Sequence, residues 1–202
     1  RRRAAATGGP ARAQVPRLTA IWRRFLAGLP TAARPLVSRY PWVVVLGESG
    51  AGKTTVIDSK ADWQSQSNSK FPSYTQEPPL QLYLGGSMVV HELSPQLVAD
   101  SRKPVSDALY ALWRPLCRAR PPLAVVVLSL EQLRRASPLQ LRIQAQRIEG
   151  TLRPLSILCG TPILTRVCLT HLDALSRDWA AADGRELKSG LDYLARRLQE
   201  LR

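Results

Sequence analysis

Eight consecutive residues, Gly47 to Thr54, have the types and spacing of a phosphate-binding loop. They read Gly-Glu-Ser-Gly-Ala-Gly-Lys-Thr and directly follow an apolar stretch that ends at Leu46. The glycines allow a tight backbone that approaches phosphate oxygens, and successive N–H groups at a helix N-terminus form a cradle for anions. In such a loop Lys53 would reach the β- and γ-phosphates, and the Thr54 hydroxyl would ligate Mg²⁺. The predicted phosphate-binding residues are Gly47, Glu48, Ser49, Gly50, Ala51, Gly52, Lys53, Thr54 and Thr55. A glycine-rich turn that carries a lysine by chance is the alternative, which the preceding apolar stretch disfavours.

Apolar runs alternate with helical patterns along the chain, which is typical of an α/β fold with a mostly parallel sheet and helices on both faces. The predicted strands are 40–46, 80–84, 88–93, 123–130 and 163–169, and the predicted helices are 52–58, 105–116, 138–152 and 185–201. Residues 85–87 read Gly-Gly-Ser, which predicts a β-hairpin around them. Residues 62–79 show no periodicity and are expected to form a long loop. In P-loop switch proteins the first nucleotide-sensing segment lies here; a flexible insertion is the alternative.

The beginning of the chain is expected to lie outside this α/β unit. Residues 1–14 are rich in arginine, alanine and glycine, which predicts a basic flexible arm. Across 15–39 apolar residues recur at helical spacing, which predicts an N-terminal amphipathic helix packed on the domain or on a membrane surface. Residues 40–202 then form the P-loop domain. Because the chain starts at Arg1, we expect it to be a fragment of a larger membrane protein.

The charge balance points to an anionic partner or to a compositional bias. The 202 residues include 29 Lys+Arg against 15 Asp+Glu, a formal net charge of +14. Such an excess suits nucleic acid, a lipid surface or an acidic protein. Aromatic residues are not interleaved with the basic ones as a base-stacking platform would need, so nucleic-acid binding is not expected. The 3 cysteines form no Cys-x-x-Cys, and we expect them to be reduced and buried.

A hydrolysing P-loop enzyme needs a second acidic group at the end of an apolar strand to hold the Mg²⁺ shell. The expected place is the end of 88–90, after which the chain reads His-Glu-Leu-Ser-Pro over 91–95. The imidazole of His91 is a poor ligand for Mg²⁺, and Glu92 would take this role only with a shift to the other face of the strand. The Asp-x-x-Gly switch that senses γ-phosphate in GTPases is also missing. We therefore expect weak or no hydrolysis; the alternative is a working ATPase or GTPase with Glu92 or Asp100 as metal ligand.

A second motif, Thr170-His171-Leu172-Asp173, follows the predicted strand 163–169. GTPases carry Asn/Thr-Lys-x-Asp at this point, where the aspartate accepts two hydrogen bonds from guanine and the lysine stem packs on the base. Here the aspartate stands and His171 replaces the lysine. The predicted base-binding residues are thus Thr170, His171 and Asp173, with a weak preference for guanine. The alternative is that Asp173 caps the following helix.

Several segments resemble the IcmF/TssM family, inner-membrane components of type VI secretion systems. Residues 41–55 are similar to the family's opening "PWYLVLGPPGAGKTT", and residues 122–133 look like its "INGVVLTLSLADLL". Residues 146–152 and 162–175 resemble its next helix and strand, in the correct order. The departures are His-Glu-Leu-Ser-Pro at 91–95 in place of "DTAGR", and Thr-His-Leu-Asp at 170–173 in place of "TKxD".

The resemblance implies a cytoplasmic GTPase-like module of a membrane-anchored scaffold at the cytoplasmic face of the bacterial inner membrane. Its implied ligands are GTP or ATP with Mg²⁺, and its implied partners are other membrane and baseplate proteins of the secretion complex and the adjacent inner membrane. The function expected on this basis is a purine-nucleotide-binding regulatory or scaffold domain. An active ATPase or GTPase that powers assembly of the complex is one alternative, and a nucleotide-free docking domain is another.

Overall fold

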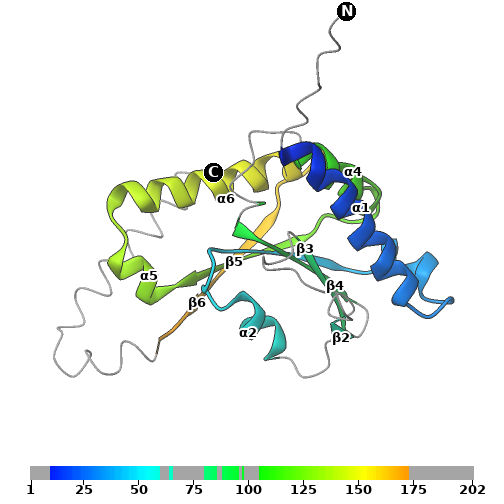
Figure 1. The fold of residues 1–202 in the computed structure, drawn as a ribbon, viewed down its shortest axis with the longest axis horizontal. Helices are drawn as coiled ribbons and strands as arrows, with labels where there is room; N and C mark the ends of the chain where they lie inside the picture. The colour runs from blue at the N-terminus through cyan, green and yellow to red at the C-terminus, as the bar shows by residue number, and fades with distance from the viewer. Residues whose placement is uncertain are drawn as a thin grey trace, which may run out of the picture.

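A mixed sheet forms the centre of the computed structural model, which describes residues 10–59, 64–65, 80–85, 88–95, 97 and 105–172 (Figure 1). Among these residues the strand order is β2-β3-β4-β1-β5-β6. The strands β4, β1, β5 and β6 run parallel, whereas β2 and β3 are antiparallel to their neighbours. The strands are β1 (Trp42–Leu46), β2 (Gln64–Ser65), β3 (Leu80–Gly85), β4 (Met88–Leu93), β5 (Leu123–Ser129) and β6 (Leu164–Thr170).

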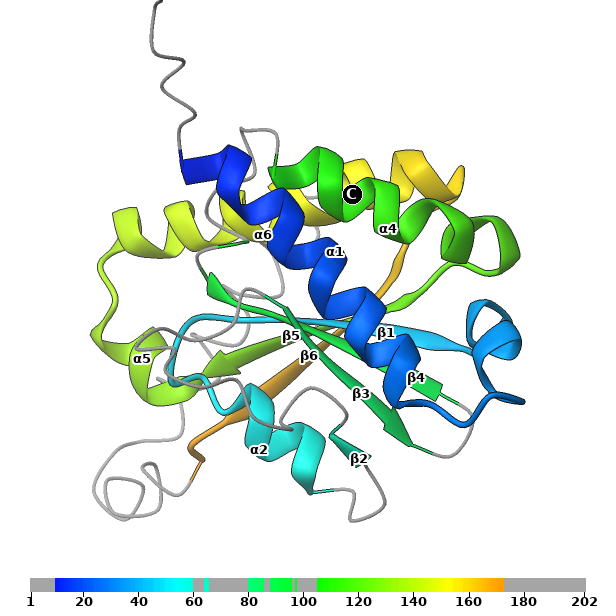
Figure 2. The same ribbon diagram turned by 45° about the vertical axis from the view of Figure 1, so that its right-hand side comes forward.

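Helices lie on both faces of this sheet, as predicted (Figures 1 and 2). One face is covered by α1 (Pro10–Gly28), α4 (Val105–Ala119) and α6 (Pro138–Cys159), and the other carries α2 (Lys53–Asp58). A short 3₁₀ helix, η1 (Arg34–Arg39), precedes β1, and α5 (Leu130–Arg135) follows β5 directly. The order of the strands, with the phosphate-binding loop after the central strand β1, defines a P-loop NTPase fold of the GTPase-like type.

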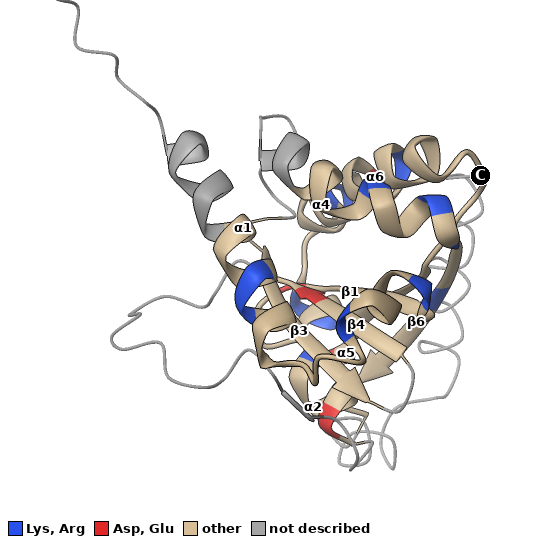
Figure 3. Cartoon of the chain, turned by 90° about the vertical axis from the view of Figure 1, so that its right-hand side faces the viewer, with Lys and Arg blue, Asp and Glu red and all other residues tan. Residues whose placement is uncertain are grey.

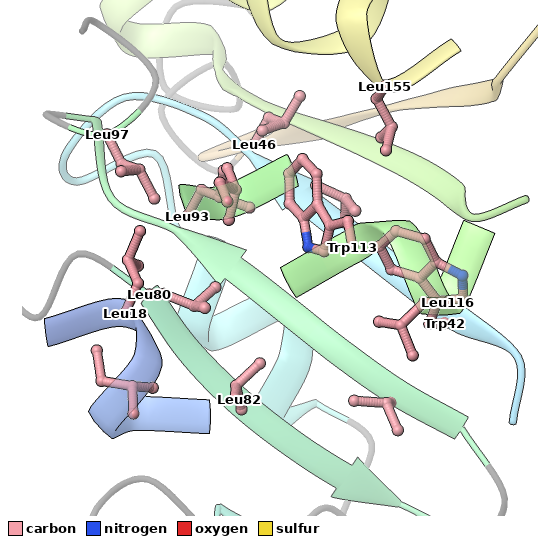
Figure 4. Packing of buried hydrophobic residues seen from close by; sticks show 14 of the residues in the cluster. Leu18, Trp42, Leu46, Leu80, Leu82, Leu93, Leu97, Trp113, Leu116 and Leu155 are labelled. Atoms are coloured by element: carbon pink, nitrogen blue, oxygen red, sulfur yellow. The ribbon is translucent and has the colours of Figure 1, made fainter. Parts of the chain in front are cut away.

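Alternation along each strand separates two apolar cores. On β1, Val44 and Leu46 point into the core under α1, α4 and α6, whereas Val43 and Val45 point toward α2. The larger core contains Trp42 and Trp113, which are both buried (Figure 4). Fully burying a large apolar side chain contributes about 1.5–3 kcal/mol, so this layer holds the helices on the sheet.

The predicted β-hairpin is confirmed, and its register matters for the site. Strands β3 and β4 pair antiparallel, with Gly85 opposite Met88 and Leu80 opposite Leu93. This register places Gln81 directly opposite Glu92 and Tyr83 opposite Val90. Residues two apart on a strand share a face, so Gln81, Tyr83 and Glu92 lie on the same side of the sheet.

Several predicted boundaries are wrong. The first helix begins at Pro10, inside the range 1–14 that was assigned to a flexible arm, and ends at Gly28. Proline is tolerated in a first helical turn, and Ala11, Arg12 and Ala13 are good helix formers. The helix predicted to end at residue 152 continues to Cys159, where Gly160 terminates it with a φ of 66°. Within the predicted loop 62–79 the strand β2 pairs with β3.

Other expectations fall outside the described residues. These include the rest of the predicted arm (1–9), Asp100, Asp173 and the predicted helix 185–201. Among the described residues no helix is both long enough and apolar enough to cross a membrane. Lysines and arginines occur on α1, α4, α6 and β6 rather than on a single element (Figure 3).

Candidate nucleotide-binding site

The phosphate-binding loop joins β1 to α2, and its glycines are required for two different reasons. Gly50 and Gly52 have φ values of 71° and 83°, in the left-handed region that favours glycine. Gly47 instead lies against the neighbouring strand β5, since an added Cβ would come within 2.5 Å of the Val127 carbonyl oxygen. The loop therefore combines a turn and a close backbone approach, both of which exclude larger residues.

Lys53 opens α2 and its side chain is only 7% exposed. Its Nζ donates hydrogen bonds to the carbonyl oxygens of Gly47, at 3.1 Å, and of Glu48, at 2.9 Å. The side chain thus reaches back along the loop, and its ammonium group lies at the loop rather than in the core. A positive charge at this position can bind the phosphates of a nucleotide seated on the loop.

The hydroxyl of Thr54 donates to Glu92, at 3.1 Å from Oε1 and 3.4 Å from Oε2. Glu92 is 6% exposed, and its Oε2 also accepts a hydrogen bond of 2.7 Å from the phenol of Tyr83. Burial, followed by the hydrogen bond to Glu92, raises the pKa of Tyr83 far above its ordinary value, so the phenol keeps its proton. Residues from α2, β3 and β4 therefore meet in one hydrogen-bonded cluster.

This cluster corrects the expectation that the end of β4 presents His91 to the site. Glu92 shares its face with Val90, which belongs to the α2-side core, and the P-loop lies on that face. His91 points the opposite way, into the core under α1 and α4. Glu92 and His91 do lie on opposite faces, but the site is on the face of Glu92, and no shift of the strand is needed.

Thr54 and Glu92 together suit a magnesium ion. Both offer oxygen atoms, which Mg²⁺ prefers, and Mg²⁺ in nucleotide sites is held by one or two protein groups together with phosphates. Because the Thr54 proton is donated to Glu92, the lone pairs of its hydroxyl oxygen can face a cation. Among the described residues no three His, Cys, Asp or Glu side chains form a metal-binding group, so phosphate oxygens would have to complete the coordination.

His91 is a core residue with one unusual feature. Its ring is 0% exposed and is surrounded by Trp22, Trp42 and Trp113, with ring-centroid distances of 6.0, 5.3 and 6.4 Å. Its Nδ1 accepts a hydrogen bond of 3.2 Å from Trp113 Nε1, while Nε2 has no partner among the described residues. Burial lowers the pKa of His91 to about 3, so the ring is neutral at physiological pH.

Two of the three predicted base-binding residues lie beside the loop. Thr170 ends β6, and its hydroxyl donates to the carbonyl oxygen of Ala51 at 2.6 Å, which ties this strand to the phosphate-binding loop. His171 is exposed, has a φ of 56°, and lies near Gly52. Asp173 lies outside the described residues, so its contact with a base stays a prediction.

A cavity of about 350 Å³ lies between the loop, the ends of β3 and β4, and the end of β6. Its volume falls within the range of about 300–1,000 Å³ that is usual for small-ligand sites. Its lining combines phosphate-loop residues, the carboxylate of Glu92 and the imidazole of His171. The lining residues are Gly50, Gly52, Lys53, Thr54, Thr55, Gln81, Glu92, Ser94 and His171.

Two residues that sequence analysis missed brace the first half of the loop. Gln132 of α5 donates from Nε2 to the carbonyl oxygen of Ser49 at 2.8 Å. Arg147 of α6 pairs with Glu48 at 3.1 Å, where both side chains are partly exposed. A partly exposed ion pair contributes at most about 1 kcal/mol, so its effect is to orient the loop more than to stabilise the fold. No local motif marks either residue.

No protein-family model matches the chain, and no curated protein matches it. Among solved structures, the G domain of the T. maritima FeoB iron transporter is similar at 13% identity and a TM-score of 0.33, over 80% of this chain and 98% of that chain. A small COPII coat GTPase from Encephalitozoon cuniculi in complex with GDP is similar at 11% identity and a TM-score of 0.28, over 79% and 78%. Nucleotide-free NFeoB from S. thermophilus is similar at 14% identity and a TM-score of 0.33, over 63% and 54%. The strand order and loop geometry of the chain itself define a P-loop domain with a GTPase-like fold.

Proposed function

We propose that this domain binds a purine nucleotide together with Mg²⁺ and acts as a regulatory domain with little or no hydrolysis. The observation that carries the proposal is the convergence of Lys53, Thr54 and Glu92 on one cavity beside a glycine-rich loop. These are a cation for phosphate, a hydroxyl for a metal and a carboxylate that orients the hydroxyl. A chance glycine-rich turn would not bring the third group to the other two.

Each group has a defined part in binding. The loop N–H groups and the N-terminus of α2 receive phosphate oxygens, and Lys53 adds a full positive charge. Thr54 and Glu92 would hold Mg²⁺, which neutralises phosphate charge when bound. His171 can stack on the base, and Asp173 would accept hydrogen bonds from guanine N1 and N2.

Nucleotide titration tests the proposal directly. The purified domain is titrated with labelled GTP, GDP and ATP, with Mg²⁺ and with EDTA. We expect saturable binding that Mg²⁺ strengthens and a weak preference for GTP over ATP. Equal affinity for GTP and ATP would make Asp173 a helix cap instead of a base-binding residue. Absence of binding to all three nucleotides would favour the nucleotide-free docking domain.

We expect turnover to be slow, because the chain after Glu92 lacks a phosphate-sensing donor. If Glu92 occupies the aspartate position of Asp-x-x-Gly, then Pro95 occupies the glycine position, and proline has no N–H to donate to a γ-phosphate. Ser94 also accepts a hydrogen bond from the N–H of Leu97 at 3.3 Å, which fixes this segment as a capped turn.

The measurement is phosphate release at saturating GTP and ATP under single-turnover and steady-state conditions. A rate on the order of 1 per second, the low end for phosphoryl-transfer enzymes, would contradict slow turnover and favour an active ATPase or GTPase. The placement of Glu92 at the site is the observation that keeps this alternative open.

We further propose that the domain is the cytoplasmic regulatory part of a type VI-like secretion membrane complex at the bacterial inner membrane. The support is the sequence similarity of residues 41–55, 122–133 and 162–175 to the IcmF/TssM family. Its partners would then be the nucleotide, other membrane and baseplate proteins of the complex, and the adjacent membrane. Fractionation of host cells that express the full-length protein tests this role: recovery in the soluble fraction alone would contradict it.

A further inference from the structure

The carboxylate of Glu92 is held from two sides. Its Oε1 faces the Thr54 hydroxyl at 3.1 Å, and its Oε2 faces the Tyr83 hydroxyl at 2.7 Å. The register of β3 and β4 produces this contact, because it puts Tyr83 on the face of Glu92 and two residues from the position directly opposite it. Tyr83 is 1% exposed, and its ring packs with Val45, Ile57 and Val90 in the α2-side core. The phenol is therefore fixed by its own packing.

The phenol proton belongs to Glu92. A tyrosine hydroxyl has one proton, and an ionised carboxylate is a stronger acceptor than an amide oxygen. Gln81 Oε1 also lies 2.7 Å from the phenol oxygen, so the hydroxyl has no neighbour among these two that competes for the proton with equal strength. Glutamate has one more rotatable bond than aspartate, and it needs more restraint to keep an oxygen in one place.

We propose that Tyr83 is a positioning residue for the Mg²⁺–nucleotide site: it fixes Glu92 so that the carboxylate orients the Thr54 hydroxyl toward the metal. This inference rests on the proposed nucleotide-binding function. Tyr83 touches neither nucleotide nor metal; it acts through Glu92. Groups that hold the ligands of a metal in this way typically affect metal affinity by about 10- to 100-fold when they are mutated.

The test is the Tyr83→Phe variant, which removes the hydroxyl and keeps the ring in the core. Fluorescent GTP is held at a fixed concentration, and Mg²⁺ is titrated to find the midpoint of the metal-dependent increase in binding. We expect the Mg²⁺ midpoint to rise about 10-fold in Tyr83→Phe, in line with other supports of metal ligands. GTP affinity in EDTA should equal that of the wild type, because the phosphate contacts of the loop and Lys53 are unchanged.

Two further variants separate positioning from a structural effect. Tyr40→Phe is the matched control, since Tyr40 packs against the opposite core, and it should leave the Mg²⁺ midpoint unchanged. Glu92→Gln should raise the midpoint, and adding Tyr83→Phe to it should raise it no further, because the two residues act as one unit. Thermal melting without ligand shows that each variant is folded.

Two results would overturn the inference, and they are distinguishable. A lower melting temperature of Tyr83→Phe with an unchanged Mg²⁺ midpoint would leave Tyr83 as a packing residue only, while the nucleotide-binding function stands. Absence of GTP binding by the wild type, with and without Mg²⁺, would overturn both the function and the role of Tyr83.

Discussion

The Lys53→Ala variant is expected to bind nucleotide about 100-fold more weakly than the wild type. Hydrogen bonds to charged groups contribute about 1.5–3 kcal/mol each, and about 1.4 kcal/mol corresponds to tenfold in affinity. Lys53 is the one side chain of the predicted phosphate-binding residues that carries a positive charge. Isothermal calorimetry with GTP and GDP measures the loss. Unchanged affinity would contradict the assignment of this loop to phosphate binding.

The same variant should keep its fold. The Lys53 ammonium bonds to the carbonyl oxygens of Gly47 and Glu48, which lie at the loop, so alanine leaves no gap in the two apolar cores. Arg118→Ala is the matched control for charge: Arg118 lies in the last turn of α4 and is exposed. It removes one positive charge from a chain of net charge +14 and should not change nucleotide affinity.

The phosphate-binding loop was predictable because everything that it requires is contiguous. The strand that ends at Leu46, the glycines, Lys53 and Thr54 follow one another, so spacing alone places them. Glu92 was harder to place, because β1 is apolar on both faces and does not reveal which face carries the loop. The hairpin held the missing information: the turn at 85–87 fixes a register that groups Gln81, Tyr83 and Glu92.

The braces of the loop could not be predicted from sequence. Gln132 is 83 residues from Ser49, and Arg147 is 99 residues from Glu48. Such pairs meet only when β5, α5 and α6 have folded against β1, and no local pattern records that packing. The start of α1 at Pro10 was missed for the opposite reason, since the local composition suggested an arm where packing and propensity support a helix.

Acid is expected to destabilise the domain through His91. The pKa of His91 is about 3 in the folded chain, against an ordinary value of 6.5 that applies when the chain is unfolded. Below pH 6.5 the unfolded chain therefore takes up a proton that the folded chain excludes, and the free energy of unfolding falls. The maximal slope from this one group is about 1.4 kcal/mol per pH unit, and the loss continues down to about pH 3. Above pH 6.5 both states are neutral, and His91 contributes no pH dependence.

Urea denaturation at pH 7, 6 and 5 measures this loss before most carboxylates take up protons. His91→Asn removes the titrating ring and can keep an acceptor near Trp113 Nε1, so this variant should lose most of the slope between pH 6 and 5. His171→Asn is the matched control, because His171 is exposed and is the other of the 2 histidines. A slope that persists in His91→Asn and disappears in His171→Asn would assign the acid sensitivity to the nucleotide site. The opposite pattern would show that the tryptophan-lined core, directly behind the strand that carries Glu92, is where acid acts on the fold.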